Sequence, residues 1–235
     1  MRKLGIAAGV VVVLVGIVVV FFGQLGRIIK HGVETYGPQI TGTPVALSSA
    51  RVSIFSGAGS LSGLEVGNPK GFTTGQAFEL GKIAIVIDPK SVTGDVIHIK
   101  SLVIDGASLV AEFSAEGHNN LNDILQHAQD TAGHTPPAPP GKEGSGPQKK
   151  MIIDEFRFTN AEVRAVATTF KLDRKLKISD VERSHLGGKD GATAADIAVQ
   201  VLRPVIEGAV HAAAQEYLKA KGGELGRSLL DRLRK

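Results

Sequence analysis

The strongest constraint on the fold of this chain is an apolar pattern that occurs twice, 54 positions apart. A polar pair stands at the same place in each copy, Asp105-Gly106 in the first and Thr159-Asn160 in the second. The matched apolar residues are Ile99, Leu102, Ile104, Ala107, Leu109 and Ala111 in the first copy and Ile153, Phe156, Phe158, Ala161, Val163 and Ala165 in the second. Alternation of this kind is typical of strands with one buried face. The repeat therefore predicts an antiparallel sheet, extended by repeated hairpins and apolar on one face throughout.

The rest of the body also favours a mainly β fold with helices. Alternation begins beyond Thr43, and the 29 glycines with 5% aromatic residues fit a turn-rich sheet better than a helical bundle. Strands are expected over 82–87, 96–104, 107–113, 151–159, 161–170 and 172–181. The expected organisation of the body is a β-sheet repeat region over 43–131, a Pro- and Gly-rich linker or loop over 132–150 and a second hairpin repeat over 151–192.

The N-terminus carries a long uncharged run. Leu4 to Phe22 is nineteen consecutive residues without a charged or polar side chain. A helix of that length spans about 30 Å, the thickness of the hydrocarbon core. We therefore expect residues 1–25 to form an uncleaved, single-pass transmembrane anchor, with the free amino terminus in the cytoplasm. A membrane-proximal helix should follow over 26–42 and stop before Pro38.

Two further helical regions are predicted. A short helix is expected at 119–128, capped by an Asn. Amphipathic helices should fill 193–235, beginning at a capping box formed by Thr193 and Asp196 and breaking at Gly222-Gly223. The apolar stripe of the longer helix consists of Ile197, Val201, Val205, Ala209, Ala213 and Tyr217. This stripe is too wide to be left in water, so we expect it to dock on the apolar face of the sheet, on a second copy or on the membrane surface.

The chain lacks the residue patterns of common catalytic and metal sites. It has no cysteine, and its seven histidines do not form an i, i+4 pair beside a carboxylate. Gly187-Gly188-Lys189-Asp190 lacks the spacing of a phosphate loop, and Ser62 lies in a strand pattern rather than between a strand and a helix. The net charge of +4 is too small and too dispersed for a nucleic-acid partner. We expect no enzyme activity, cofactor or metal.

Several segments together resemble bacterial AsmA-like proteins. They are residues 37–47, 61–72, 87–92 and 119–125, which follow the apolar N-terminus, and the most specific block is Gly67-Asn68-Pro69-Lys70-Gly71-Phe72. The resemblance implies a Gram-negative inner-membrane protein with a periplasmic β-groove body, related to the chorein-type repeating-groove lipid-transfer proteins and associated with phospholipid traffic. Eight to ten strands would extend the sheet by only about 40–50 Å, too short to bridge two membranes alone.

Two functions remain open at this point. In the first, the sheet handles or shields membrane lipids for envelope lipid homeostasis; in the second, the body is a non-enzymatic scaffold or accessory subunit whose sheet is closed by the C-terminal helix. The candidate groove residues are Ile99, Ile104, Leu109, Ile153, Phe158 and Val163. The candidate partners are membrane lipids, together with a second copy or a membrane protein bound through the C-terminal helix.

Overall fold

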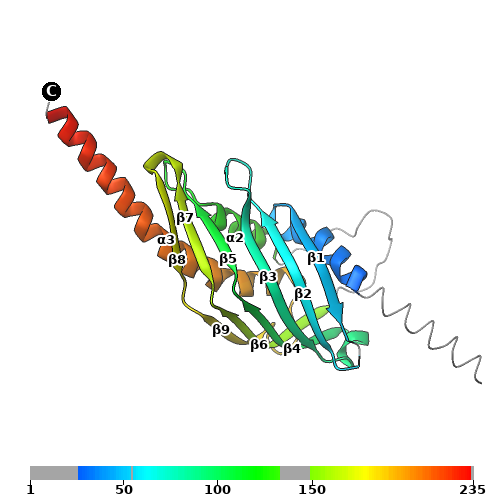
Figure 1. Cartoon of the computed structure of the whole chain (residues 1–235). Coiled ribbons are helices and arrows are strands. Elements are labelled where there is room, and N and C mark those ends of the chain that lie inside the picture. The colour runs from blue at the N-terminus through cyan, green and yellow to red at the C-terminus, as the bar shows by residue number, and fades with distance from the viewer. Residues whose placement is uncertain (1–25, 54, 133–148, 234–235) are drawn as a thin grey trace, which may run out of the picture.

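The computed structural model describes residues 26–53, 55–132 and 149–233. The transmembrane anchor predicted over residues 1–25 lies outside these described residues, as does most of the linker predicted over 132–150. The described residues form a nine-stranded sheet with helices behind it (Figure 1). The mainly β architecture with helices is therefore confirmed.

The strands follow the apolar alternation of the sequence. Their bounds are β1 Val45–Val52, β2 Ala58–Gly67, β3 Gln76–Ile87, β4 Val96–Asp105, β5 Ser108–Glu112, β6 Lys150–Thr159, β7 Glu162–Ala167, β8 Leu172–Lys177 and β9 Val181–Leu186. Two short 3₁₀ turns, Ser91–Thr93 and Thr168–Phe170, connect β3 to β4 and β7 to β8. The single strand expected over 172–181 is in fact two strands, β8 and β9.

The sheet is mixed, so the expectation of a purely antiparallel sheet was wrong. β1, β2 and β3 pair antiparallel in chain order, and β3 then pairs with both β4 and β5. β6 lies parallel to β4 and β7 lies parallel to β5, because the chain returns to the same end of the sheet through α2 before β6 begins. Each residue of the first copy of the repeat stands beside its equivalent in the second, as Ile99 does beside Ile153.

The repeated unit is an interrupted strand and not a hairpin. Lys82 of β3 lies opposite Asp105 of β4. Glu79, three residues before Lys82, lies opposite Ser108 of β5, three residues after Asp105. The register is therefore the same on both sides of Gly106, and β5 continues β4 along the edge of β3. β7 continues β6 and β8 continues β9 in the same way. The Asp-Gly pair suggested a turn because glycine at positive φ serves a turn and a strand irregularity equally well.

These interruptions form one line across the sheet, which we call the crease. The pairing registers align one position from each long strand along it: Ser48, Gly63, Gly81, Gly106, Asn160 and Ser179. At the crease the alternation of side chains restarts, so inward residues step by three, as from Ile104 to Ala107 and from Phe158 to Ala161. Because every strand makes the same step, one face stays apolar along its whole length.

Backbone conformation and polar contacts hold the crease. Gly63, Gly106 and Asn160 have φ values of +61°, +72° and +53°, in the left-handed region. The Thr159 hydroxyl and the Asn160 amide donate to Asp105 Oδ1 at 2.8 and 2.7 Å. The Asn160 amide and then the Thr159 hydroxyl hold the pKa of Asp105 below its ordinary value. These conformations and contacts stabilise the interruption of the strands at the crease.

Two glycines of the crease should respond oppositely to alanine. Neither Gly106 nor Gly81 has an atom within 4 Å of an added Cβ, but only Gly106 has a positive φ. Gly106→Ala should therefore lower the free energy of unfolding by about 1–2 kcal/mol, the cost of a left-handed alanine. Gly81→Ala should raise it by roughly 0.5 kcal/mol. Urea titrations of both variants measure the two changes, and equal effects would contradict the crease conformation.

Three helices accompany the sheet on its inner side: a helix over 26–41, α2 (Asn120–Thr131) and α3 (Ala194–Leu233). The two predicted caps are confirmed. Asn119 Oδ1 accepts from the N–H of Leu121 and Asn122 at the start of α2. Before α3, Thr193 Oγ1 accepts from the Asp196 N–H at 3.2 Å and Asp196 Oδ2 accepts from the Thr193 N–H at 3.3 Å.

Two predicted helix ends were wrong. The first helix continues past Pro38 to residue 41, where the Thr41 hydroxyl donates to the carbonyl of Gly37 at 2.9 Å and Gly42 N–H to that of Pro38. α3 runs without a break through Gly222 and Gly223. Each glycine costs a helix only about 1 kcal/mol, which its helix-forming neighbours offset.

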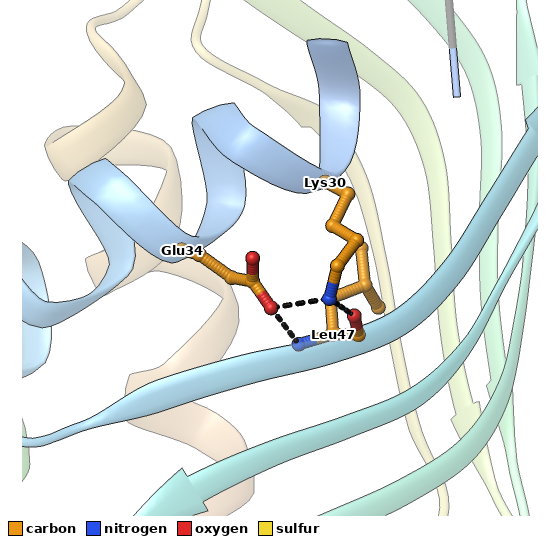
Figure 2. Close-up of polar contacts among 3 residues, drawn as sticks. All are labelled: Lys30, Glu34 and Leu47. Atoms are coloured by element: carbon orange, nitrogen blue, oxygen red, sulfur yellow. Dashed lines mark hydrogen bonds and ion pairs between the residues drawn. The ribbon is translucent and has the colours of Figure 1, made fainter. Parts of the chain in front are cut away.

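The helix over 26–41 covers the free edge of β1, as Figure 2 shows. Lys30 Nζ donates to the Leu47 carbonyl, and Glu34 Oε1 accepts from the Leu47 N–H at 3.1 Å. Lys30 also pairs with Glu34, and this ion pair, followed by the Leu47 N–H, lowers the pKa of Glu34. The two side chains satisfy the backbone groups of Leu47, and so protect an edge that would otherwise pair with another chain.

Candidate functional site

The six candidate groove residues lie together on the inner face of the sheet. They form three neighbouring pairs across the parallel ladders: Ile99 with Ile153, Ile104 with Phe158, and Leu109 with Val163. All six belong to one hydrophobic cluster, and each is at most 8% exposed. The structure thus brings the six residues onto one surface, and that surface is covered.

α3 is the main cover of this surface. Of its predicted stripe, Ile197, Val205, Ala209, Ala213 and Tyr217 are buried and Val201 is half-buried. The helix lies against the strands from β5 to β9 and against α2 (Figure 1). Small residues on the sheet, such as Ala111 and Ala165, face this region and let the helix backbone approach closely.

Tyr217 fixes α3 across the far end of the sheet. Its ring stacks on Phe113 with centroids 4.7 Å apart and meets the edge of Phe170 at 5.5 Å. Its hydroxyl donates to the carbonyl oxygens of Ala115 at 3.1 Å and Ser114 at 3.3 Å. One side chain therefore joins α3 to the chain segments that follow β5 and β7.

The inner face is less covered on β2, β3 and β4. Five apolar residues there are only half-buried and pack at the margin of the main cluster; we call them the open strip: Leu61, Ile85, Ile87, Ile97 and Leu102. Ile85 and Leu102 are direct partners across the β3–β4 ladder, so the strip crosses neighbouring strands. It lies on the side of the crease that contains the β1–β2 turn. The strip gives the apolar core a partly accessible margin.

A buried carboxylate lies at the opposite end of the sheet. Glu112, at the end of β5, is 6% exposed and accepts hydrogen bonds from four donor groups of two adjacent threonines. Its Oε1 accepts from Thr73 N–H at 2.9 Å and Thr73 Oγ1 at 2.7 Å, and its Oε2 from Thr74 N–H at 2.8 Å and Thr74 Oγ1 at 2.6 Å. Burial raises the pKa of Glu112, but the bonds from Thr74 and Thr73 outweigh burial and leave it lowered.

Two asparagines extend this network. Asn120 Oδ1 accepts from the Glu112 N–H at 2.9 Å, and its amide donates to Asn68 Oδ1 at 2.6 Å and to the Val110 carbonyl at 2.9 Å. Asn68 in turn donates to Thr74 Oγ1 at 2.6 Å. The network clamps the β2–β3 loop to β5 and to the start of α2. Sequence reasoning singled out both Asn segments but missed Glu112, whose only signal is a charge inside an apolar strand.

The described residues contain no cluster suited to metal binding. Among residues 26–53, 55–132 and 149–233, no group of three His, Cys, Asp or Glu side chains could hold a metal ion. Ser62 lies within β2, and Gly187-Gly188 form a turn between β9 and α3.

Within the same described residues, one helix is long and apolar enough to cross a membrane by length and composition alone. It is the Ala194–Glu224 part of α3. Its stripe is buried against the sheet, while 28% of the apolar window as a whole is buried.

Comparisons with known proteins identify one family. The sequence model of the AsmA family matches residues 59–200, more than half of the 235-residue chain. The match covers the sheet from β2 to the first turns of α3 and includes both asparagine segments of the Glu112 network. No curated protein and no solved structure matches the chain.

Proposed function

This chain belongs to the AsmA family, and on that premise we propose that it is a membrane-anchored envelope protein that shields lipid acyl chains on the inner face of its sheet. Family membership is consistent with a function in the cell envelope. The proposed location is the inner membrane of a Gram-negative bacterium, with one N-terminal crossing, a cytoplasmic N-terminus and a periplasmic body. The activity needs no catalytic residue.

The open strip is the observation that carries this proposal. It is apolar, half-buried and continuous with the core, so a chain of methylenes laid on it leaves water without entering the closed part of the sheet. Each methylene removed from water contributes about 0.8 kcal/mol. Contact with about five methylenes would therefore offset roughly 4 kcal/mol of the cost of drawing a lipid from the bilayer.

The width of the sheet limits how such a protein works. Since β5, β7 and β8 continue β4, β6 and β9, the nine strands occupy six positions side by side. Six positions span about 25 Å, less than the 40–50 Å expected from eight to ten adjacent strands. We therefore propose local shielding of lipid at one membrane and not a bridge between two membranes.

Polar substitutions in the open strip should reduce lipid binding without unfolding the body. Full-length Leu61→Ser and Ile97→Ser, purified in a mild detergent, should each retain a few-fold less phospholipid than the parent, because each removes an apolar contact. Lipid mass spectrometry measures the amount, and circular dichroism checks folding. Leu218→Ser, an exposed position on α3, is the matched control and should retain the parental amount. Equal lipid content in all four proteins would refute the strip as the binding surface.

The scaffold function has one observation in its favour. α3 covers the inner face and continues past the end of β8 (Figure 1), and its residue Leu218 is 64% exposed. As a scaffold, the chain would use this projecting part of α3 to bind a second copy or a membrane protein. Light scattering of the full chain separates the two functions. If the chain is a scaffold, Leu218→Ser should reduce the oligomeric mass; if it only shields lipid, the mass should stay unchanged.

A further inference from the structure

Four segments from distant parts of the chain meet at one end of the sheet, which we call the entry end. They are the start of the helix over 26–41, the β1–β2 turn, the β3–β4 connection and the start of β6. The Ile87 N–H donates to the Gly57 carbonyl at 2.9 Å, and Lys149 Nζ donates to the Val92 carbonyl. A Cβ added to Gly26 would lie 2.2 Å from the Ala50 carbonyl oxygen, so the helix begins in contact with β1 near this end.

The entry end exposes large apolar side chains. Phe55 in the β1–β2 turn is 85% exposed, Ile28 in the first helix 62% and Val92 in the β3–β4 connection 44%. These are three of the five large apolar side chains that stand out as exposed among the described residues; the other two are Tyr36 and Leu218. Such a concentration of exposed apolar side chains at one end of the sheet indicates an apolar partner.

Cations accompany these apolar side chains. Arg27, Arg51, Lys90 and Lys149 are all exposed on the same four segments. The same segments also carry two carboxylates, Asp88, whose Oδ1 accepts from the Lys90 N–H, and Asp95. Apolar side chains ringed by Lys and Arg match the interface of an anionic bilayer, where the cations meet headgroups and the apolar groups enter the acyl boundary.

The position of the entry end in the chain selects the bilayer over a second copy. The uncharged run ends at Phe22, and Gly26 begins the described helix four residues later. Four residues reach at most about 14 Å. If Leu4 to Phe22 crosses the membrane, as the proposed function requires, Gly26 lies within that distance of the membrane surface, and the end of β1 around Ala50, which Gly26 contacts, lies close to it.

We propose that the entry end rests on the anionic surface of the bilayer that holds the N-terminal anchor, with Phe55 and Val92 inserted at the headgroup boundary. This inference rests on the anchor of the proposed function but not on lipid binding by the open strip. In this docked position one end of the open strip faces the bilayer, because its residues Ile87 and Ile97 flank the β3–β4 connection. A lipid would then pass between bilayer and strip without crossing water.

A single tryptophan reports this docking directly, because the protein has no tryptophan of its own. Full-length Phe55→Trp is reconstituted in vesicles of phosphatidylcholine with about one third phosphatidylglycerol, with or without bromine on the acyl chains. Bromine should remove roughly half of its emission, as expected for a side chain at the acyl boundary. Val92→Trp provides a second reporter. Leu218→Trp is the matched control at the other end of the molecule and should lose almost none.

The outcomes separate the docking from the proposed function. A chain that does not float with the vesicles refutes the anchor itself. A floating chain whose Phe55→Trp and Val92→Trp emissions are quenched no more than that of Leu218→Trp refutes the docking alone, whatever the lipid content of the strip variants. Equal quenching in vesicles without phosphatidylglycerol would overturn the role given to Arg27, Arg51 and Lys90.

Discussion

Ile104→Asp should abolish folding of the body or leave it barely stable. Ile104 is 7% exposed, on β4 beside Phe158 of β6 and within the main cluster covered by the helices. Its replacement removes a buried apolar side chain and places a carboxylate where no partner is available. The combined cost is at least about 5 kcal/mol, comparable with the roughly 5–15 kcal/mol that stabilises a whole domain. Circular dichroism and urea titration measure the loss.

Two controls identify the cause of this loss. Ile104→Val keeps an apolar side chain and should cost only about 1 kcal/mol. Lys100→Asp introduces the same carboxylate on the exposed face of the same strand and should leave stability within about 0.5 kcal/mol. If Ile104→Asp kept the parental melting temperature, the inner face at β4 would be open, and the candidate groove would extend beneath α3.

Glu112→Ala should have the second largest effect. Without the carboxylate, the N–H groups and hydroxyls of the half-buried Thr74 and the exposed Thr73 lose their acceptor. A stranded N–H costs about 1–3 kcal/mol at the half-buried Thr74, whereas the exposed Thr73 can bond to water, so we expect a total of about 2–3 kcal/mol. The β2–β3 loop should also open locally in this variant, because its hydrogen bonds to β5 through Glu112 are gone. Hydrogen exchange of residues 68–75 and urea titration detect the two effects.

The same carboxylate should make stability depend on pH. Its folded-state pKa is lowered from the ordinary value of 4.5, so its contribution is fully present above about pH 4.5 and is lost as the pH falls through the folded-state pKa. Glu112→Gln cannot be protonated in this range, so this part of the acid sensitivity should vanish in the variant. Glu207→Gln, at an exposed position on α3, is the matched control. If the stability of the parent and of Glu112→Gln fell equally as the pH is lowered, Glu112 would not be the source of this acid sensitivity.

The repeat predicted more of the fold than the local signals did. The 54-residue spacing placed equivalent apolar residues on one face, and the structure sets them side by side. What the spacing did not predict is that Asp105-Gly106 continues a strand. The steps of three from Ile99 to Leu102 and from Ile104 to Ala107 were visible departures from alternation, but only the partner strand decides between a turn and an irregularity.

Which element covers the candidate groove could not be predicted from any single segment of the sequence. The stripe on α3 predicted docking, but which surface the stripe meets follows from the path of the whole chain. Glu112 went unnoticed for the same reason. Its donors, Thr73 and Thr74, are separated from it by the whole of β3 and β4, and a buried carboxylate is recognisable only once its donors are in place.

The crease also restricts how a protein with this sheet can grow. A new strand that alternates strictly would face the core correctly on one side of Gly106 and present polar side chains to it on the other. Only a strand carrying its own irregularity at the matching position joins without loss. Tandem duplication of the 54-residue segment supplies such a strand at once, whereas a strand recruited from elsewhere needs the irregularity first. Lengthening by copying is therefore the accessible evolutionary route for this sheet.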